Sequence, residues 1–208
     1  MSPSVWEDST LPGAPVEAGS RAALRRHLAA NVVGLDIGRS DWEFIYGVRV
    51  EGLATGIRFR AGVQGTANAV MLECAFAACT TAIRVESLNG VGLSATACSF
   101  EGTDTALEAA ASFTTTVQFN TCSFAGPDAA VRLVGRGLLS FQNCQFVGSI
   151  QAEAGQLAAV DCGFDTRRPH IQLGPDVTRA RILGCRFGGE PSIETVAGTQ
   201  ADIDRQDT

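Results

Sequence analysis

Lysine is missing from this chain of 208 residues, so arginine supplies all sixteen basic side chains. This absence excludes Schiff-base chemistry and a phosphate-binding loop of the Gly-Lys-Ser type. Either a biased genome composition or recognition of carboxylates by planar guanidinium groups would explain it. Histidine is limited to His27 and His170, and no Cys-x-x-Cys pair occurs. We therefore predict neither a zinc site nor a cofactor.

The hydrophobic pattern, the net charge and the N-terminal sequence make several classes of protein less favoured. No run of about 18 apolar residues occurs, so we expect no membrane span. The net charge of −6 makes nucleic acid a poor partner. The chain is 45% hydrophobic, which is too apolar for a disordered protein. Its N-terminus lacks the basic start and apolar stretch of a secretion signal, which indicates either a cytoplasmic chain or a piece of a longer protein.

A short pattern, Cys-x-Phe, occurs six times. Successive cysteines are 24, 24, 22, 18 and 23 residues apart. A period near 22 residues is too short for a helix-pair repeat and too long for a hairpin, but it suits one coil of a solenoid. The six copies begin at Cys74, Cys98, Cys122, Cys144, Cys162 and Cys185.

Alignment of the repeats on the cysteine predicts three strands in each coil. The residues five and three positions before the cysteine are apolar, as expected for inward-pointing residues that alternate along a strand. The cysteine and the phenylalanine also point inward, although strict alternation from the earlier residues would point them outward. A corner is therefore expected just before each cysteine, at residues that include Asn120, Asn143, Asp161 and Gly184. A glycine-containing turn follows most of the phenylalanines, and a third apolar segment such as Ile83-Arg84-Val85 comes next. This pattern predicts an all-β parallel β-helix with three sheets and about seven coils.

The repeat also suggests how the chain is divided. We expect residues 1–38 to be a linker and a capping helix that begins after Ser20, residues 39–195 to be the β-helix, and residues 196–208 to be a polar tail. The thin C-terminal end indicates a truncated chain or a partner, such as a second β-helix domain, that seals it. Stacked cysteines roughly 4.8 Å apart are too widely spaced for unstrained disulfides, so we expect reduced, buried thiols.

The three-strand coil resembles the pectate lyase-like right-handed parallel β-helix superfamily. A closer similarity, to microbial β-helix proteins related to family 55 glycoside hydrolases, lies in DWEFIYGVRVEG at 41–52 and TGIRF at 55–59. The resemblance implies a single-stranded right-handed β-helix, an extracellular location and a polysaccharide ligand. No family catalytic motif matches a position in this chain, so no catalytic residue is carried over.

The third strand of each coil carries an outward column that is entirely polar. Polysaccharides generally lie across one outward sheet in the resembled superfamily, so this column is the candidate substrate strip. Its predicted substrate-binding residues are Arg58, Arg84, Arg132, Gln151 and Gln172, with Glu108 and Glu194 in the same column. Two interpretations stay open, namely a surface ion ladder or a strip that binds sugars or uronates.

Glycoside hydrolysis needs two carboxyl groups about 5–5.5 or 6.5–9.5 Å apart. Glu108 is the candidate base because flanking arginines favour its charged form, and Glu86 or Asp104 is the candidate acid. A lyase would instead use a cluster formed by Asp161, Asp165, Arg167, Arg168 and His170, which is otherwise an ordinary hydrated turn. Trp42 and Tyr46 either stack on sugar rings or pack the capping region.

These observations leave two hypotheses for function. The first is a carbohydrate-active β-helix protein, either a glycoside hydrolase or polysaccharide lyase or a non-catalytic β-helix domain of a larger enzyme. The alternative is a structural, adhesin-like or tailspike-like β-helix that works by assembly. Glycan binding and release of reducing sugar would distinguish them.

Overall fold

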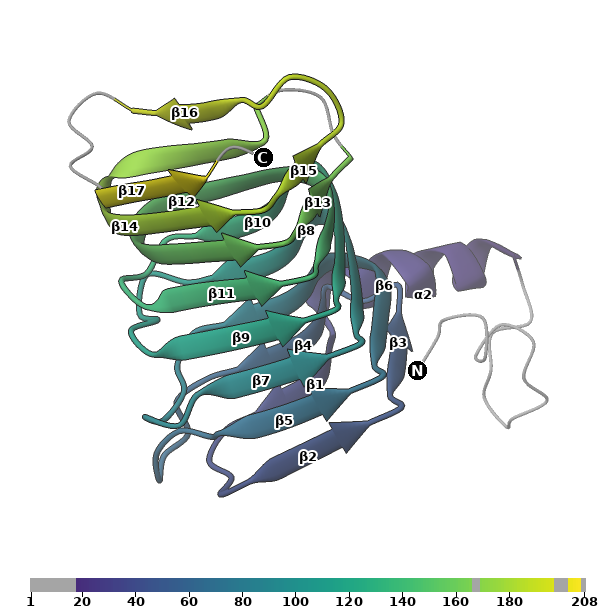
Figure 1. The fold of residues 1–208 in the computed structure, drawn as a ribbon. Helices are drawn as coiled ribbons and strands as arrows, with labels where there is room; N and C mark the ends of the chain where they lie inside the picture. The colour runs from purple at the N-terminus through teal and green to yellow at the C-terminus, as the bar shows by residue number, and fades with distance from the viewer. Residues whose placement is uncertain (1–17, 166–168, 197–201, 207–208) are drawn as a thin grey trace.

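The computed structural model describes residues 18–165, 169–196 and 202–206. In this part of the chain the named strands pair in parallel and form a solenoid of about seven turns, as the repeat predicted. Figure 1 shows the chain running rightward along the near sheet, turning away from the viewer, returning behind, and rising by one level toward the C-terminus. The coil is therefore right-handed, which is the usual hand of parallel crossover connections.

Each coil contributes to three faces. Face one is formed by β2 (Glu43–Tyr46), β5 (Ala69–Leu72), β7 (Leu93–Thr96), β9 (Thr116–Asn120), β11 (Leu138–Gln142), the ends of β12 (Gln145–Val160) and β14 (Ile171–Leu183), and β17 (Asp202–Gln206). Face two is formed by β3 (Arg49–Glu51), the starts of β6 (Ala75–Val85), β8 (Ser99–Ala109), β10 (Ser123–Leu133) and β12, then β13 (Gly163–Phe164) and β15 (Arg186–Phe187). Face three is formed by β1 (Val33–Ile37), β4 (Thr55–Phe59), the later parts of β6, β8, β10 and β12, the start of β14, and β16 (Ile193–Thr195).

The corner between faces one and two lies where the sequence predicted it, immediately before the cysteine. The residue there has a left-handed backbone in every coil, and these residues are Gly47, Glu73, Ala97, Thr121, Asn143, Asp161 and Gly184. Asn143, Asp161 and Gly184 confirm the prediction. Asn120 does not, because it ends β9 and the adjacent Thr121 makes the turn. The residues other than glycine at this corner are exposed, and each bears the local cost of a left-handed backbone, about 1–2 kcal/mol.

The second corner differs from the expected turn. β6, β8 and β10 each continue for 11 residues from Cys-x-Phe through the third segment, and the bend is marked by shifts of register and, in β6, by the left-handed backbone of Ala78. Between β6 and β8 the pair Cys79 and Gly102 lies within the corner, where the two strands bend together. Gly102 lies in this bend, where an added Cβ would meet the carbonyl oxygen of Thr105.

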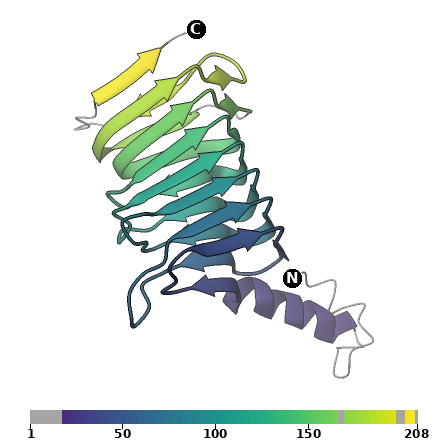
Figure 2. The same ribbon diagram turned by 60° about the horizontal axis from the view of Figure 1, so that its bottom comes forward.

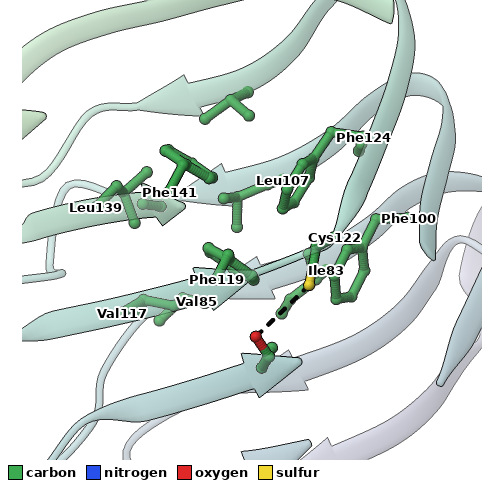
Figure 3. Packing of buried hydrophobic residues seen from close by; sticks show 14 of the residues in the cluster. Ile83, Val85, Phe100, Leu107, Val117, Phe119, Cys122, Phe124, Leu139 and Phe141 are labelled. Atoms are coloured by element: carbon green, nitrogen blue, oxygen red, sulfur yellow. Dashed lines mark hydrogen bonds between the residues drawn. The ribbon is translucent and has the colours of Figure 1, made fainter. Parts of the chain in front are cut away.

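The interior is filled by columns of like side chains. Phe76, Phe100, Phe124, Phe146 and Phe164 stack with centroid separations of 4.8–5.7 Å, and Phe187 continues the column. Figure 3 shows Phe119 and Phe141 from face one meeting this stack edge-on. Both apolar columns of face one are also in register, as the sequence predicted.

All seven cysteines are free thiols, and all except the half-buried Cys185 are buried, in agreement with the reduced, buried thiols expected for the repeat cysteines. The Sγ of Cys122 donates to the carbonyl oxygens of Ala95 and Asn120 at 3.5 and 3.4 Å (Figure 3 shows a dashed line from this sulfur). Equivalent contacts to backbone carbonyls recur in the neighbouring coils. In each of these contacts the thiol is the donor and the backbone carbonyl oxygen is the acceptor.

The N-terminal end is partly covered by α2 (Ala18–Asn31), which confirms the predicted helix. Ser20 lies within the helix and does not cap it, because Ala18 and Gly19 are already helical. The carbonyl of Leu28 accepts from the N–H of Ala54, and the Leu28 side chain packs against the core. Figure 2 shows α2 beside the first coils. Pairing of β1 with β4 and of β17 with β14 adds one strand beyond each of the expected domain boundaries.

Candidate functional site

The predicted outward column of face three exists as a continuous strip. Strand register aligns one side chain from each coil along it, and the aligned residues are Asp36, Arg58, Arg84, Glu108, Arg132, Gln151, Gln172 and Glu194. All five predicted substrate-binding residues therefore lie side by side, and they are half-buried. We call these eight residues the polar strip. The inward neighbours of the strip, such as Leu107 and Ala109, are fully buried and fix the direction in which it points.

The strip begins with an ion pair that the sequence reasoning missed. Asp36 on β1 accepts from Arg58 Nη2 at 2.9 Å and from Arg60 Nε at 2.9 Å. The hydrogen bond from Arg58, assisted by Arg60, lowers the pKa of Asp36 below its ordinary 3.8 despite the opposing effect of burial. The alternation of Leu35, Asp36 and Ile37, which matches that of Ile57, Arg58 and Phe59, was the signal that could have found this rung.

Because of Asp36, the free energy of unfolding should depend on pH under acidic conditions. Because the pKa of Asp36 is lower in the folded protein, its contribution is present above 3.8 and is lost as the pH falls through the folded value. We expect Asp36→Asn to reduce the free energy of unfolding by under about 1 kcal/mol near neutral pH, since the pair is largely solvated. Urea titrations at about pH 7 and about pH 2 should show this difference vanishing in acid. An equal difference at both values would contradict the assignment.

The predicted arrangement of Glu108 between two arginines is only half correct. Arg84 Nη1 lies 3.3 Å from Glu108 Oε2, and Arg84 Nε donates to Glu86 Oε1 at 3.0 Å. Arg132 instead pairs with Asp104, at 3.2 Å between Nη1 and Oδ2. The bend within β8 brings the Asp104 carboxylate within reach of this guanidinium. Each of the three predicted catalytic carboxylates is thus an ion-pair partner of a strip arginine.

The C-terminal end of the strip borders a pocket of about 240 Å³. Gln151, Gln172 and Glu194 from the strip line it together with Glu153. Gln172 Nε2 donates to Glu194 Oε2 at 3.3 Å, which orients the carboxamide. Sequence reasoning missed Glu153 because it lies just beyond the third apolar segment, where a turn was expected. The pocket therefore combines two carboxamides with two carboxylates. This set can accept hydrogen bonds from hydroxyl groups and can also donate hydrogen bonds to them.

Three of the five residues considered for a lyase lie in the described part of the chain, where Asp161 and Asp165 are exposed and His170 is buried. His170 is 1% exposed and packs edge-on against Phe187 at 5.0 Å between ring centroids, so it belongs to the aromatic interior. Asp161 occupies the left-handed corner before Cys162, and Arg167 and Arg168 lie outside the described residues. Within the described ranges no group of three or more His, Cys, Asp or Glu is arranged to hold a metal ion.

Trp42 and Tyr46 do not pack the capping region. They are 59% and 67% exposed, so the packing interpretation is wrong. Tyr46 lies on β2, the first strand of face one, and Trp42 immediately precedes this strand, whereas the polar strip lies on face three.

In comparisons with known proteins, no protein family, no curated protein and no solved structure matches the chain. In the described part of the chain, no helix combines the length and the hydrophobicity needed to cross a bilayer.

Proposed function

We propose that this protein is a carbohydrate-binding β-helix that holds an extended polysaccharide along the polar strip. The observation that carries the proposal is the strip itself, which offers one polar side chain per coil, about 4.8 Å apart, and ends at the pocket of Gln151, Glu153, Gln172 and Glu194. These side chains are half-buried, except that Asp36 and Glu194 at the two ends of the strip are exposed. A regular row of polar groups suits a regular polymer of hydroxyl-bearing units. The resemblance to family 55-like β-helix proteins supports the same ligand class and an extracellular location.

The charge distribution favours an uncharged glycan. Arg58, Arg84 and Arg132 already pair with carboxylates of the protein, so they are poorly placed to grip the carboxylates of a uronate. Their paired groups still present fixed donors and acceptors to sugar hydroxyls. The acidic side chains of the pocket further disfavour an anionic polymer.

Binding is a better proposal than hydrolysis for this strip. Arg84 contacts both Glu86 and Glu108, and Arg132 contacts Asp104. These contacts engage the carboxylate oxygens with guanidinium groups of the protein, whereas glycoside hydrolysis needs two carboxyl groups that face the bond to be cleaved. If the protein does hydrolyse a glycan, Glu108→Gln should abolish the release of reducing sugar and leave the melting temperature nearly unchanged.

The binding proposal is tested with soluble glycans on the full chain. In affinity electrophoresis, the wild-type protein should bind an uncharged polymer such as β-1,3-glucan and should bind polygalacturonate more weakly. Gln172→Ala removes a pocket hydrogen-bonding group, and we expect it to raise the dissociation constant about 3- to 10-fold. Gln118→Ala is the matched control, because Gln118 is exposed on face one, away from the strip.

Two outcomes would contradict the proposal. Equal effects of Gln172→Ala and Gln118→Ala would show that the strip is not the binding surface. Failure to bind any glycan, together with self-association of the protein in solution, would favour the structural or adhesin-like alternative.

A further inference from the structure

The outward side of β2 carries exposed aromatic side chains that the core does not use. Phe44 is 72% exposed and Tyr46 is 67% exposed, and Trp42 in the preceding turn is 59% exposed. Nine of the eleven phenylalanines are buried and Phe187 is half-buried, so Phe44 is the one exposed phenylalanine of the chain. We call Trp42, Phe44 and Tyr46 the aromatic platform. Exposed apolar clusters of this kind generally mark a binding surface.

The fold does not demand aromatic residues at these positions. Val70 and Leu72 on β5 are in register with Phe44 and Tyr46, and they extend the apolar surface by one rung. The same two outward columns then become polar on β7, β9 and β11, where they consist of Ser94, Thr96, Gln118, Asn120, Ser140 and Gln142. The platform is therefore a local departure at the first two coils.

The platform is held rigidly. Trp42 has a left-handed backbone, with φ of 68°, and its N–H donates to Asn68 Oδ1 at 2.9 Å. Asn68 is 3% exposed and its Oδ1 also accepts from Asn89 Nδ2 at 3.2 Å. The Tyr46 hydroxyl donates to Glu73 Oε2 at 3.1 Å. A bulky residue in this conformation is strained, and the buried amide of Asn68 fixes it in place.

A second protein strand is a poor occupant for the open edge of β2. Glu43 begins the inward column that continues through Ala69 and Leu93, and it accepts from Ser40 Oγ at 2.7 Å. Another coil stacked on β2 would bury this carboxylate, and inward-pointing charges are a known protection of edge strands. The three exposed aromatic side chains offer roughly 300–500 Å² together. That area is well below the roughly 800 Å² per partner of a stable protein interface, and a net charge of −6 makes copies repel one another.

We propose that the aromatic platform is a second binding site, which stacks the pyranose rings of an uncharged glycan. Apolar C–H faces of the sugar would lie on the aromatic rings, while the Glu73 carboxylate and the Tyr46 hydroxyl would bond to hydroxyl groups at the rim. Phe44 and Tyr46 are two residues apart on one strand, which spaces them by about 6.6–6.8 Å along it. Glu43 and Glu73 would repel uronates. The site shares its ligand class with the proposed function but lies on face one, so the two fail independently.

Tryptophan emission isolates this site. The chain holds only Trp6 and Trp42, so in a Trp6→Phe background all emission comes from the platform. Titration with laminarihexaose, cellohexaose and chitohexaose should give a saturable change with at least one of them, and hexagalacturonate should bind at least tenfold more weakly. Phe44→Ser and Tyr46→Ser should weaken binding at least tenfold, whereas Tyr46→Phe, which keeps the ring, should stay within about threefold of wild type.

Matched variants separate the possible explanations. Val147→Ser removes an apolar side chain that is 54% exposed on β12 and should leave the titration unchanged, as should the strip variant Gln172→Ala. Circular dichroism and melting temperature check that each variant is folded. No change of emission with any uncharged oligosaccharide up to about 10 mM would overturn the proposal. It would also be overturned if wild type forms a dimer that Phe44→Ser dissociates, since the platform would then be a contact between copies.

Discussion

Phe124→Ala is expected to lower the free energy of unfolding by about 3–5 kcal/mol, the largest effect that we predict for a single side chain. Phe124 is 1% exposed and lies at the centre of the aromatic interior. Its ring stacks on Phe100 and Phe146, each with a centroid separation of 5.3 Å, and meets Phe119 and Phe141 edge-on at 5.0 and 5.3 Å. Removal of the ring leaves a cavity between coils whose backbones are fixed by pairing on both sides.

Phe44→Ala is the matched control for this variant, because it makes the same chemical change at a side chain that is 72% exposed. We expect Phe44→Ala to alter stability by under about 0.5 kcal/mol. Urea titration of both variants, followed by circular dichroism, measures the two changes directly. Similar losses for the two variants would mean that Phe124 does not lie in a packed interior.

Gly155→Ala should also destabilise the protein, by about 2–5 kcal/mol. Gly155 is buried and has φ of +79°, and an added Cβ would lie 2.5 Å from the carbonyl oxygen of Gly137 and 2.6 Å from that of Gly135. Both contacts are with backbone of the preceding coil, so relief requires adjacent coils to separate. A left-handed conformation adds its own cost for alanine.

Gly47→Ala separates these two causes. Gly47 has φ of +64°, but nothing lies within 4 Å of the position that an added Cβ would take, so only the backbone conformation is disfavoured. We expect Gly47→Ala to cost about 1 kcal/mol, in line with the alanine at the same corner in a later coil, Ala97. If Gly155→Ala costs no more than Gly47→Ala in the same urea titration, the close approach of the two coils at Gly155 is wrong.

Much of the architecture could be predicted because the repeat reports each inward position several times. The cysteine and phenylalanine columns, the two apolar columns of face one and the third strand all align in register as the sequence indicated. A single coil would be ambiguous, since short apolar segments fit several folds. Repetition at a nearly constant spacing removes that ambiguity, because the same side chain must meet its equivalent one coil away.

The details that could not be predicted depend on local backbone geometry. The sequence does not tell whether Arg132 reaches Glu108 or Asp104, because both carboxylates lie within the range of a long side chain and the bend within β8 decides between them. The exposure of Trp42 follows from its left-handed turn and from Asn68, which is 26 residues away. Continuity of the strands through the second corner was missed because glycine there suggested a turn, whereas parallel neighbours bend together.

The measurement that tests the central claim most directly is a count of reactive thiols. Stacked coils should protect the cysteine column, because all of its thiols except that of Cys185 are buried. Cys79, which lies outside the column, is also buried, and burial raises the pKa of its thiol. In native protein, Ellman's reagent should modify no more than one of the seven thiols within minutes, namely the half-buried Cys185, and all seven should react in guanidinium chloride. Rapid reaction of several thiols in the native protein would contradict the stacked interior.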